Sequence, residues 1–435
     1  MEISLESAFE REYSSLHDAV DNFFVASSPE QALTERRREA AKRLEIVAAS
    51  LPEPRQRPFR LFGIDTTPGL RAFATKLADR GVVYYPNPAP GNKPIGVGHS
   101  YSVLASLPER EAGDAPWIVP LSCERVPTDK TAREIAVAQV AGLLSNEQLP
   151  FADELTVEVV DSYYSRARYL HPTGGYDNHV VLARVAANRT FHRFAQVQGP
   201  PRRGHPTWYG TPFKLNDDST RGAPDETMRV EWHTSKGRAL HVTLQRWNDL
   251  LMRGKRDAPM HERAFDVIDC RAFDEQGQPV FKHTLWLMVM GERRGEIGLC
   301  QGYEAYRQRF DLEHFFRFGK NKLLLDRYQT PEVEHEENWW ELACLAYTQL
   351  WLAAPLAATL PRPWERYLPT LKNRAIPGPA QVQRDFQRII RQFGTPACSP
   401  ERRGNSPGRA KGQSPGIRPR QPVVFKNRSP PRKAA

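Results

Sequence analysis

The sequence contains no pair of cysteines at CxxC spacing. Its five cysteines are scattered over 435 residues, a pattern that argues against a zinc cluster or a disulfide framework and fits a reducing compartment. The N-terminal segment MEISLESAFERE is acidic and has no apolar core, so it does not resemble a secretory signal. The chain also has no internal repeat. These absences favour a cytoplasmic protein.

Long uncharged runs are scarce as well. The exception is Leu342–Leu360, which has 19 residues without a charged side chain and is long enough to span a membrane. The run contains polar residues and Pro355, and it is rich in alanine rather than in leucine, isoleucine and valine. We therefore expect a buried core helix and no membrane association.

The positive charge is concentrated at the C-terminus. The net charge is +10, and residues 401–435 alone hold ten Lys and Arg residues and one Glu. The same segment has six prolines and four glycines, so it cannot bury a core and is expected to be disordered until bound. A tail of this kind usually meets a polyanion such as nucleic acid.

Hydrophobic periodicity divides the chain into segments. A strand is expected to end at Asp65, a helix to follow over Gly69–Arg80, and a longer helix to cover Lys130–Gln148. The predicted divisions are a helical N-terminal region over 1–55, an α/β core in two parts over 56–189 and 284–356, a mainly β insertion over 190–283, a helical region over 357–400 and the basic tail over 401–435.

Two aspartates are placed at the ends of apolar strands, Asp65 in FGIDTTP and Asp161 in VEVVDSYY. Strand-terminal acids stand at the rim of a sheet, where active sites are often built. A single such aspartate is more often a helix cap or a turn residue. Two of them in a βββαβαβ order are harder to explain in that way.

A third acid lies in the segment YRQRFDLEHFFRFGK. At about 100° per residue, a helix here places Tyr306, Arg309, Glu313 and Lys320 on one face. The face could be merely solvated, and Gly319 could end the helix before Lys320. Alternatively, Glu313 could serve a metal site that acts on a polyanion. Mg²⁺ prefers carboxylate oxygens, and two such ions can catalyse phosphodiester cleavage with three acids from separate elements.

The spacing Tyr306-x2-Arg309-x3-Glu313-x6-Lys320 is similar, in full, to the Tyr-Arg-Glu-Lys signature of bacterial insertion-sequence DDE transposases. FGIDTTP resembles the first-acid motif of that family, VVDSYYS the second, and RVAANR the strand that follows. The resemblance covers residues 58–355 and extends to a helix over 376–394. It implies a ribonuclease-H-like mixed sheet interrupted by the β insertion.

The resemblance also implies a function. Asp65, Asp161 and Glu313 would be the catalytic triad and would bind two Mg²⁺ ions, for which Mn²⁺ can substitute. Tyr306, Arg309 and Lys320 would contact DNA. The family acts as homodimers on paired element ends, in the bacterial cytoplasm and at the nucleoid. An insertion tryptophan stacks on a flipped base in the family, and the candidates here are Trp208, Trp232 and Trp247.

Two other functions stay open: an inactive transposase descendant that only binds DNA, and an Mg²⁺-dependent nuclease of the same fold. Several further features have simpler explanations. His99 and His314 are expected to be packed or solvated, the acidic run Glu332–Glu341 to be a helix N-terminus rather than a metal site, and the basic face Arg36–Arg43 to be solvated rather than bound to DNA.

Overall fold

The computed structural model describes most of the central chain. The described residues are 20, 22–24, 28, 31–85, 92–111, 113–196, 208–233, 239–360, 375–390, 412 and 416–425. Most of the predicted N-terminal region before α2 and most of the basic tail therefore lie outside them.

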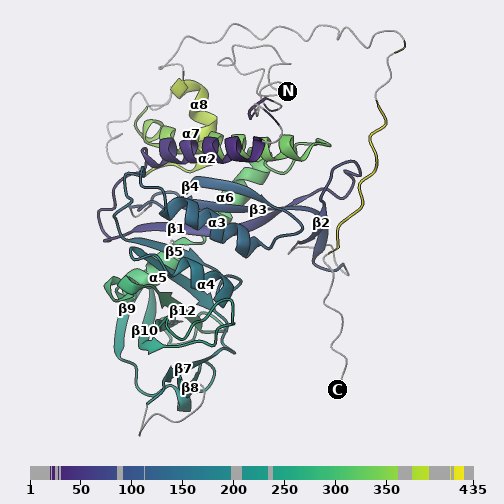
Figure 1. The fold of residues 1–435 in the computed structure, drawn as a ribbon. Helices are drawn as coiled ribbons and strands as arrows, with labels where there is room; N and C mark the ends of the chain where they lie inside the picture. The colour runs from purple at the N-terminus through teal and green to yellow at the C-terminus, as the bar shows by residue number, and fades with distance from the viewer. Residues whose placement is uncertain are drawn as a thin grey trace, which may run out of the picture.

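A ten-stranded mixed sheet forms the centre of the molecule (Figure 1). Its order is β2-β3-β1-β5-β6-β12-β11-β10-β9, and β4 pairs with β3 from Ser100 to Ser106, along the same edge as β2. β1 is antiparallel to β3 and parallel to β5, which is in turn parallel to β6. The first six strands are β1 (Arg60–Leu70), β2 (Gly81–Tyr84), β3 (Ile95–Ser106), β4 (Val119–Val126), β5 (Thr156–Val160) and β6 (His179–Val185).

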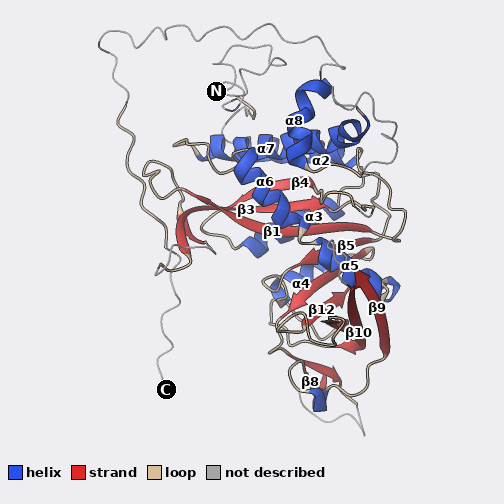
Figure 2. Ribbon diagram, turned by 180° about the vertical axis from the view of Figure 1, so that it is seen from behind, coloured by secondary structure: helices blue, strands red, loops and turns tan. Residues whose placement is uncertain are grey.

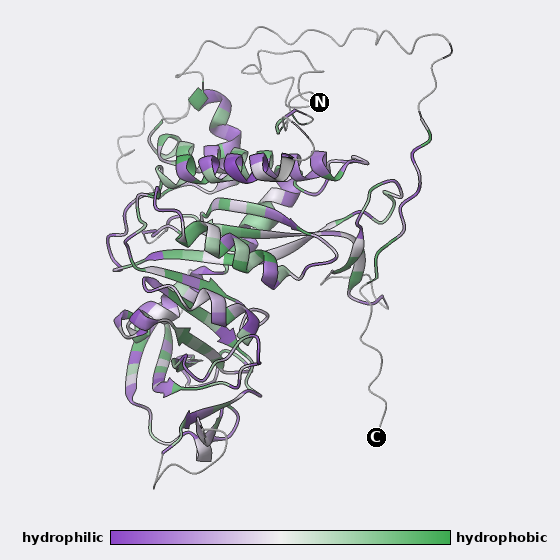
Figure 3. Cartoon of the chain, viewed as in Figure 1, coloured by the Kyte–Doolittle hydropathy of each residue, from purple (hydrophilic) through white to green (hydrophobic). Residues whose placement is uncertain are grey.

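The described residues between β6 and β12 (Leu285–Met290) are built mainly from strands. β9, β10 and β11 extend the large sheet beyond β12, while β7 and β8 form a separate two-stranded sheet. In Figure 3, β12 has a hydrophobic colour and lies among the strands drawn in the lower part of the view. The strands are β7 (Thr190–Phe194), β8 (Tyr209–Lys214), β9 (Glu226–His233), β10 (Ala239–Leu250) and β11 (Phe265–Phe273).

Helices cover both faces of the sheet and create two apolar cores. α3 and α4 pack on one face, and α5, α6, α7 and α8 on the other, where Figure 2 shows α6 lying across β1 and β3. α3 begins with a capping box between Thr131 and Glu134. The helices are α2 (Ala32–Ala48), α3 (Ala132–Leu144), α4 (Ala167–Thr173), α5 (Leu299–Gln308), α6 (Asp311–Lys322), α7 (Val333–Thr359) and α8 (Pro379–Ile390).

α2 and α7 lie together above the β4 edge of the sheet (Figure 1), which protects that edge from pairing with other chains. Arg43 of α2 binds Glu341 at 2.5 Å, and Arg36 approaches Glu337 at 3.6 Å. Part of the basic face of α2 is therefore neutralised by α7. α7 itself is long and apolar enough to span a membrane, but half of its most apolar window is buried inside the protein. This burial agrees with the expected core helix.

Two expectations about local structure are wrong. The predicted helix Gly69–Arg80 is absent, because β1 continues to Leu70 in antiparallel register with β3 and is followed by turns. Asp65 thus lies within a strand, not at its end. The predicted helix over 306–320 is two helices, since the chain tightens at Arg309 and Phe310 before α6 begins.

Residues 416–425 of the tail are ordered, although disorder is expected for this segment. The Gln421 amide donates to the Thr75 carbonyl at 2.8 Å, and the Val424 amide to that of Arg80 at 2.7 Å. The Arg80 guanidinium also donates to the Gln421 carbonyl at 2.9 Å. The segment therefore docks along the turns that precede β2.

Candidate active site

The sheet register brings the two aspartates together. Gly63 of β1 pairs with Val159 of the parallel strand β5, so Asp65 and Asp161 each follow two residues later on neighbouring strands. Their charges interact, because Asp161 contributes to the raised pKa of Asp65. The Asp161 carboxylate is oriented by the amide of Tyr163, which donates to it at 2.8 Å.

The third acid approaches through an arginine at the junction of α5 and α6. The Arg309 guanidinium donates to the Asp65 carboxylate at 2.8 Å and to that of Glu313 at 3.4 Å. Burial alone would lower the pKa of Arg309, but the three carboxylates, including Asp161, outweigh it and raise that pKa. Arg309 therefore bonds to two of the acids and is influenced by the charge of the third.

Close packing of α6 on β1 fixes this arrangement. An added Cβ at Gly63 would lie 2.9 Å from the terminal methyl of Leu312, the residue just before Glu313. Leu312 is fully buried among Leu61 and Val159, which share its core. The glycine thus lets the first turn of α6 approach the strand that carries Asp65.

The junction between α5 and α6 is a tight turn rather than a reversal. The Arg309 amide bonds to the Tyr306 carbonyl and the Leu312 amide to that of Arg309, both at 3.1 Å and both with three-residue spacing. Arg309 and Phe310 keep right-handed helical backbone angles. The predicted stripe of Tyr306, Arg309 and Glu313 is consequently distorted but not lost.

The two remaining residues of the stripe have protein partners. Tyr306 is buried, and the Arg309 guanidinium lies 5.9 Å from the centre of its ring. The Lys320 ammonium donates to the Pro68 carbonyl of β1 at 2.7 Å. α6 continues to Lys322, so Gly319 does not end it. Lys320 of α6 thus contacts the strand that carries Asp65, at Pro68, three residues after this aspartate.

Tyr164 is a site residue that the sequence analysis missed. Its hydroxyl is buried, and burial together with the charges of Asp65 and Asp161 raises its pKa well above the usual value. The signal was available in the motif VVDSYYS, which places two tyrosines directly after the acid.

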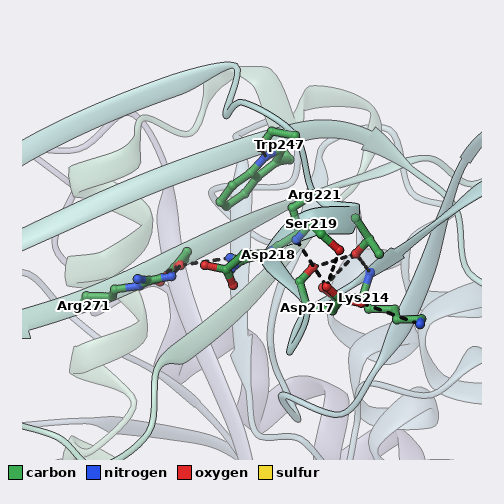
Figure 4. Close-up of polar contacts among 10 residues, drawn as sticks. Lys214, Asp217, Asp218, Ser219, Arg221, Trp247 and Arg271 are labelled. Carbon is green, nitrogen blue, oxygen red and sulfur yellow. Dashed lines mark hydrogen bonds and ion pairs between the residues drawn. The ribbon is translucent and has the colours of Figure 1, made fainter.

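The three tryptophan candidates differ in access. Trp247 is buried against Trp286, and Figure 4 shows it beside Arg221, whose guanidinium lies 5.5 Å from its ring. It has no free face for a base. Trp208 stacks on His261 at 3.7 Å between ring centres. The Arg307 guanidinium lies over the ring of Trp232, 4.0 Å from the ring centre. Only these two remain as stacking candidates.

Comparison with protein families decides the relationship. Residues 2–249 match the model described as DDE superfamily endonuclease, which is more than half of the chain. The chain belongs to this DDE family. None of the curated proteins matches it. The matched residues include Asp65 and Asp161, whereas Glu313 lies beyond them.

Membership of the DDE family implies nuclease-type or transposase-type chemistry on DNA, for which the family typically uses divalent metal ions. The three carboxylates supply the hard oxygen donors that Mg²⁺ prefers, and they already gather around a cation. Within the described part of the chain, however, no three acidic, histidine or cysteine side chains are arranged to hold a metal ion. The donor types fit, while the Arg309 guanidinium bonds to two of the three carboxylates.

The other features have structural explanations. His99 is buried, its Nε2 lies 3.0 Å from the Ala78 carbonyl, which accepts, and its Nδ1 lies 3.3 Å from the Glu336 carboxylate. His314 is partly buried against the ring of Phe310. In the acidic run, several carboxylates bind arginines rather than each other: Glu336 with Arg71, Glu337 with Arg125 and Glu341 with Arg43. The run is therefore no metal site in this conformation.

Asp65 makes the stability of the metal-free DDE protein depend on pH. Burial, with a contribution from Asp161, raises its pKa from 3.8 to about 6 despite the opposing charge of Arg309. Between these values the folded protein holds a proton that the unfolded chain has released, so stability falls as pH rises from about 4 to above 6. The loss is up to about 3 kcal/mol.

We expect Asp65→Asn to remove this loss, so that the variant gains stability relative to wild type as the pH rises. Urea unfolding at pH 4.5 and 7.5 in EDTA measures the difference. Asp311, whose pKa burial also raises to about 6 beside Arg110, titrates in both proteins and cancels in the comparison. A variant-to-wild-type difference that is independent of pH would contradict the assignment.

Proposed function

We propose that this protein is a DNA transposase. It would cleave a phosphodiester bond at each end of a mobile element and join the freed 3′-hydroxyl ends to target DNA. The observation that carries the proposal is the gathering of Asp65, Asp161 and Glu313 around one guanidinium. Three acids from β1, the end of β5 and α6 have no structural need to converge.

Asp65, Asp161 and Glu313 would hold two Mg²⁺ ions, for which Mn²⁺ can substitute. Bound metal supplies Lewis acidity for the attacking and leaving oxygens of the phosphodiester. Because the pKa of Asp65 is raised to about 6, its carboxyl is protonated below that pH, where a cation that binds there would displace the proton. The buried tyrosine Tyr164 lies close enough to Asp65 and Asp161 for their charges to raise its pKa.

Arg309 neutralises the carboxylates in the metal-free protein and would turn to a DNA phosphate when metal and substrate arrive. Its planar fork suits a phosphate as well as it suits Asp65 and Glu313. Lys320, held by the Pro68 carbonyl, keeps two further N–H groups for a second phosphate. Tyr306 would orient Arg309 from behind, through the contact between its ring and the guanidinium.

The fold is consistent with a ribonuclease-H-like core. Strands β4, β3, β1, β5 and β6 form a mixed sheet in which three antiparallel strands precede two parallel ones. Residues 190–283 would be the insertion that separates this core from Glu313. Assembly as a homodimer on paired ends, in the bacterial cytoplasm, completes the proposal.

The decisive experiment uses a plasmid that carries the gene with its natural flanking DNA. Purified protein is incubated with this donor, a target plasmid and Mg²⁺, and the products are mapped. Cleavage at the element ends with joined donor–target molecules is expected, and EDTA should abolish both. Cleavage without joining would instead identify a nuclease of the same fold. Binding of the end DNA without cleavage in Mg²⁺ or Mn²⁺ would identify an inactive descendant.

A further inference from the structure

A groove lined by cations lies next to the proposed catalytic acids. It has a volume of ≈ 860 Å³ and is formed by the start of α3, the start of α4, the turn before β7 and the loop after β10. No aspartate or glutamate is among its lining residues in the described chain. Six of those residues are cationic: Arg133, Arg166, Arg168, Arg189, Arg253 and Lys255.

These cations are poorly compensated. Arg168 binds Asp257 at 2.9 Å, whereas none of the other five has a carboxylate partner among the ion pairs of the described residues. Burial and the charge of Arg166 together lower the pKa of Arg189, and burial and Arg253 lower that of His192 despite a backbone hydrogen bond. Uncompensated like charges in one hollow cost folding free energy. A merely solvated face would not need to concentrate them there.

The groove starts beside the acids. The amide of Tyr163 holds Asp161, and the Arg133 guanidinium lies 4.4 Å from the ring centre of the same tyrosine. The turn at Arg189 follows β6, which runs parallel to β5, so it lies at the same edge of the sheet as Asp161. A polyanion that passes the acids can therefore continue directly into the groove.

We propose that this groove binds the backbone phosphates of DNA on one side of the cleaved bond, without reading base sequence. The inference rests on the proposed function for its choice of DNA as the polyanion. The lining arginines come from four separate segments, which suits a ligand with charges spaced along its length. Arg166, Arg189 and Arg253 are the residues that we expect to contribute most.

The test measures binding of a random-sequence duplex of about 30 base pairs as a function of KCl concentration, without divalent metal. In the triple variant Arg166→Gln, Arg189→Gln and Arg253→Gln, the slope of log K against log salt should fall by about 2 to 3. Affinity at low salt should fall at least 10-fold. The corresponding Arg→Lys triple variant should retain the wild-type slope, since it retains the charges.

A matched control removes three exposed cations elsewhere: Lys93→Gln, Lys282→Gln and Arg384→Gln. If the groove variant changes the slope no more than this control does, the groove assignment is wrong. The assignment also fails if polyglutamate of matched charge displaces the duplex as well as unlabelled duplex does, because the partner is then an acidic protein. Cleavage of the donor plasmid by wild type, measured separately, shows whether the proposed function survives such a failure.

Discussion

Replacing Glu313 by Gln is expected to abolish DNA cleavage, with a loss of at least about 10³-fold, while DNA binding stays within a few-fold of wild type. Gln has the shape of Glu but lacks the negative charge that a divalent metal requires. Glu313 is 43% exposed in its side chain, so the substitution buries no new polar group. Arg309 keeps its 2.8 Å bond to Asp65. Single-turnover cleavage and filter binding on the same DNA give the two numbers.

Glu304→Gln is the matched control. Glu304 is exposed on the neighbouring helix α5, and its carboxylate interacts with the Cys300 thiol rather than with the acids of the site. This variant should cleave at the wild-type rate. Wild-type cleavage by the Glu313 variant would show that the third acid is assigned wrongly. Loss of both binding and cleavage would instead show that Glu313 maintains the DNA surface.

The sequence predicted those parts of the site that depend on local pattern. Asp161 directly follows the short apolar strand β5, as its run of valines indicates. The four-residue spacing of Arg309 and Glu313 allows their contact even though α5 and α6 are separate, because the backbone between them stays helical. Short-range periodicity survives such a local distortion.

Features that depend on distant pairing could not be predicted in the same way. β1 extends past Asp65 because its later residues pair with β3, ending with Leu70 opposite Gly98. That pairing overrides the helical pattern which the sequence shows after Gly69. Likewise, the break at Arg309 and the packing of Leu312 over Gly63 require knowledge of how α6 lies on the sheet.

The acidic run of α7 shows the same limit. An acid near a helix N-terminus is normally explained by the helix dipole, and this explanation suits the exposed Glu334. Glu336, two residues later, is completely buried. Its carboxylate lies 3.3 Å from both the Arg71 guanidinium and the His99 ring. The partner Arg71 comes from the turn just after β1, where the sequence predicted a helix.

Glu336→Ala is therefore expected to cost about 3 to 5 kcal/mol of unfolding free energy, the largest stability effect that we predict. Burial would raise the pKa of Glu336, but hydrogen bonding from His99 and the charge of Arg71 lower it, so the carboxylate is charged and firmly paired. Its removal leaves the guanidinium of Arg71, whose side chain is 0% exposed, without a counter-ion. Urea unfolding of the metal-free protein at neutral pH measures the loss.

Glu334→Ala supplies the control on the same turn of α7 and should change stability by less than about 1 kcal/mol. The double variant Arg71→Met and Glu336→Ala should be less destabilised than the sum of its single variants, because it leaves no unpaired buried charge. Equal losses for Glu336→Ala and Glu334→Ala would reject the buried ion pair. The ion pair joins α7 to the turn after β1, the strand that carries Asp65 and the Lys320 contact. We expect loss of the ion pair to lower cleavage only as far as it unfolds the protein.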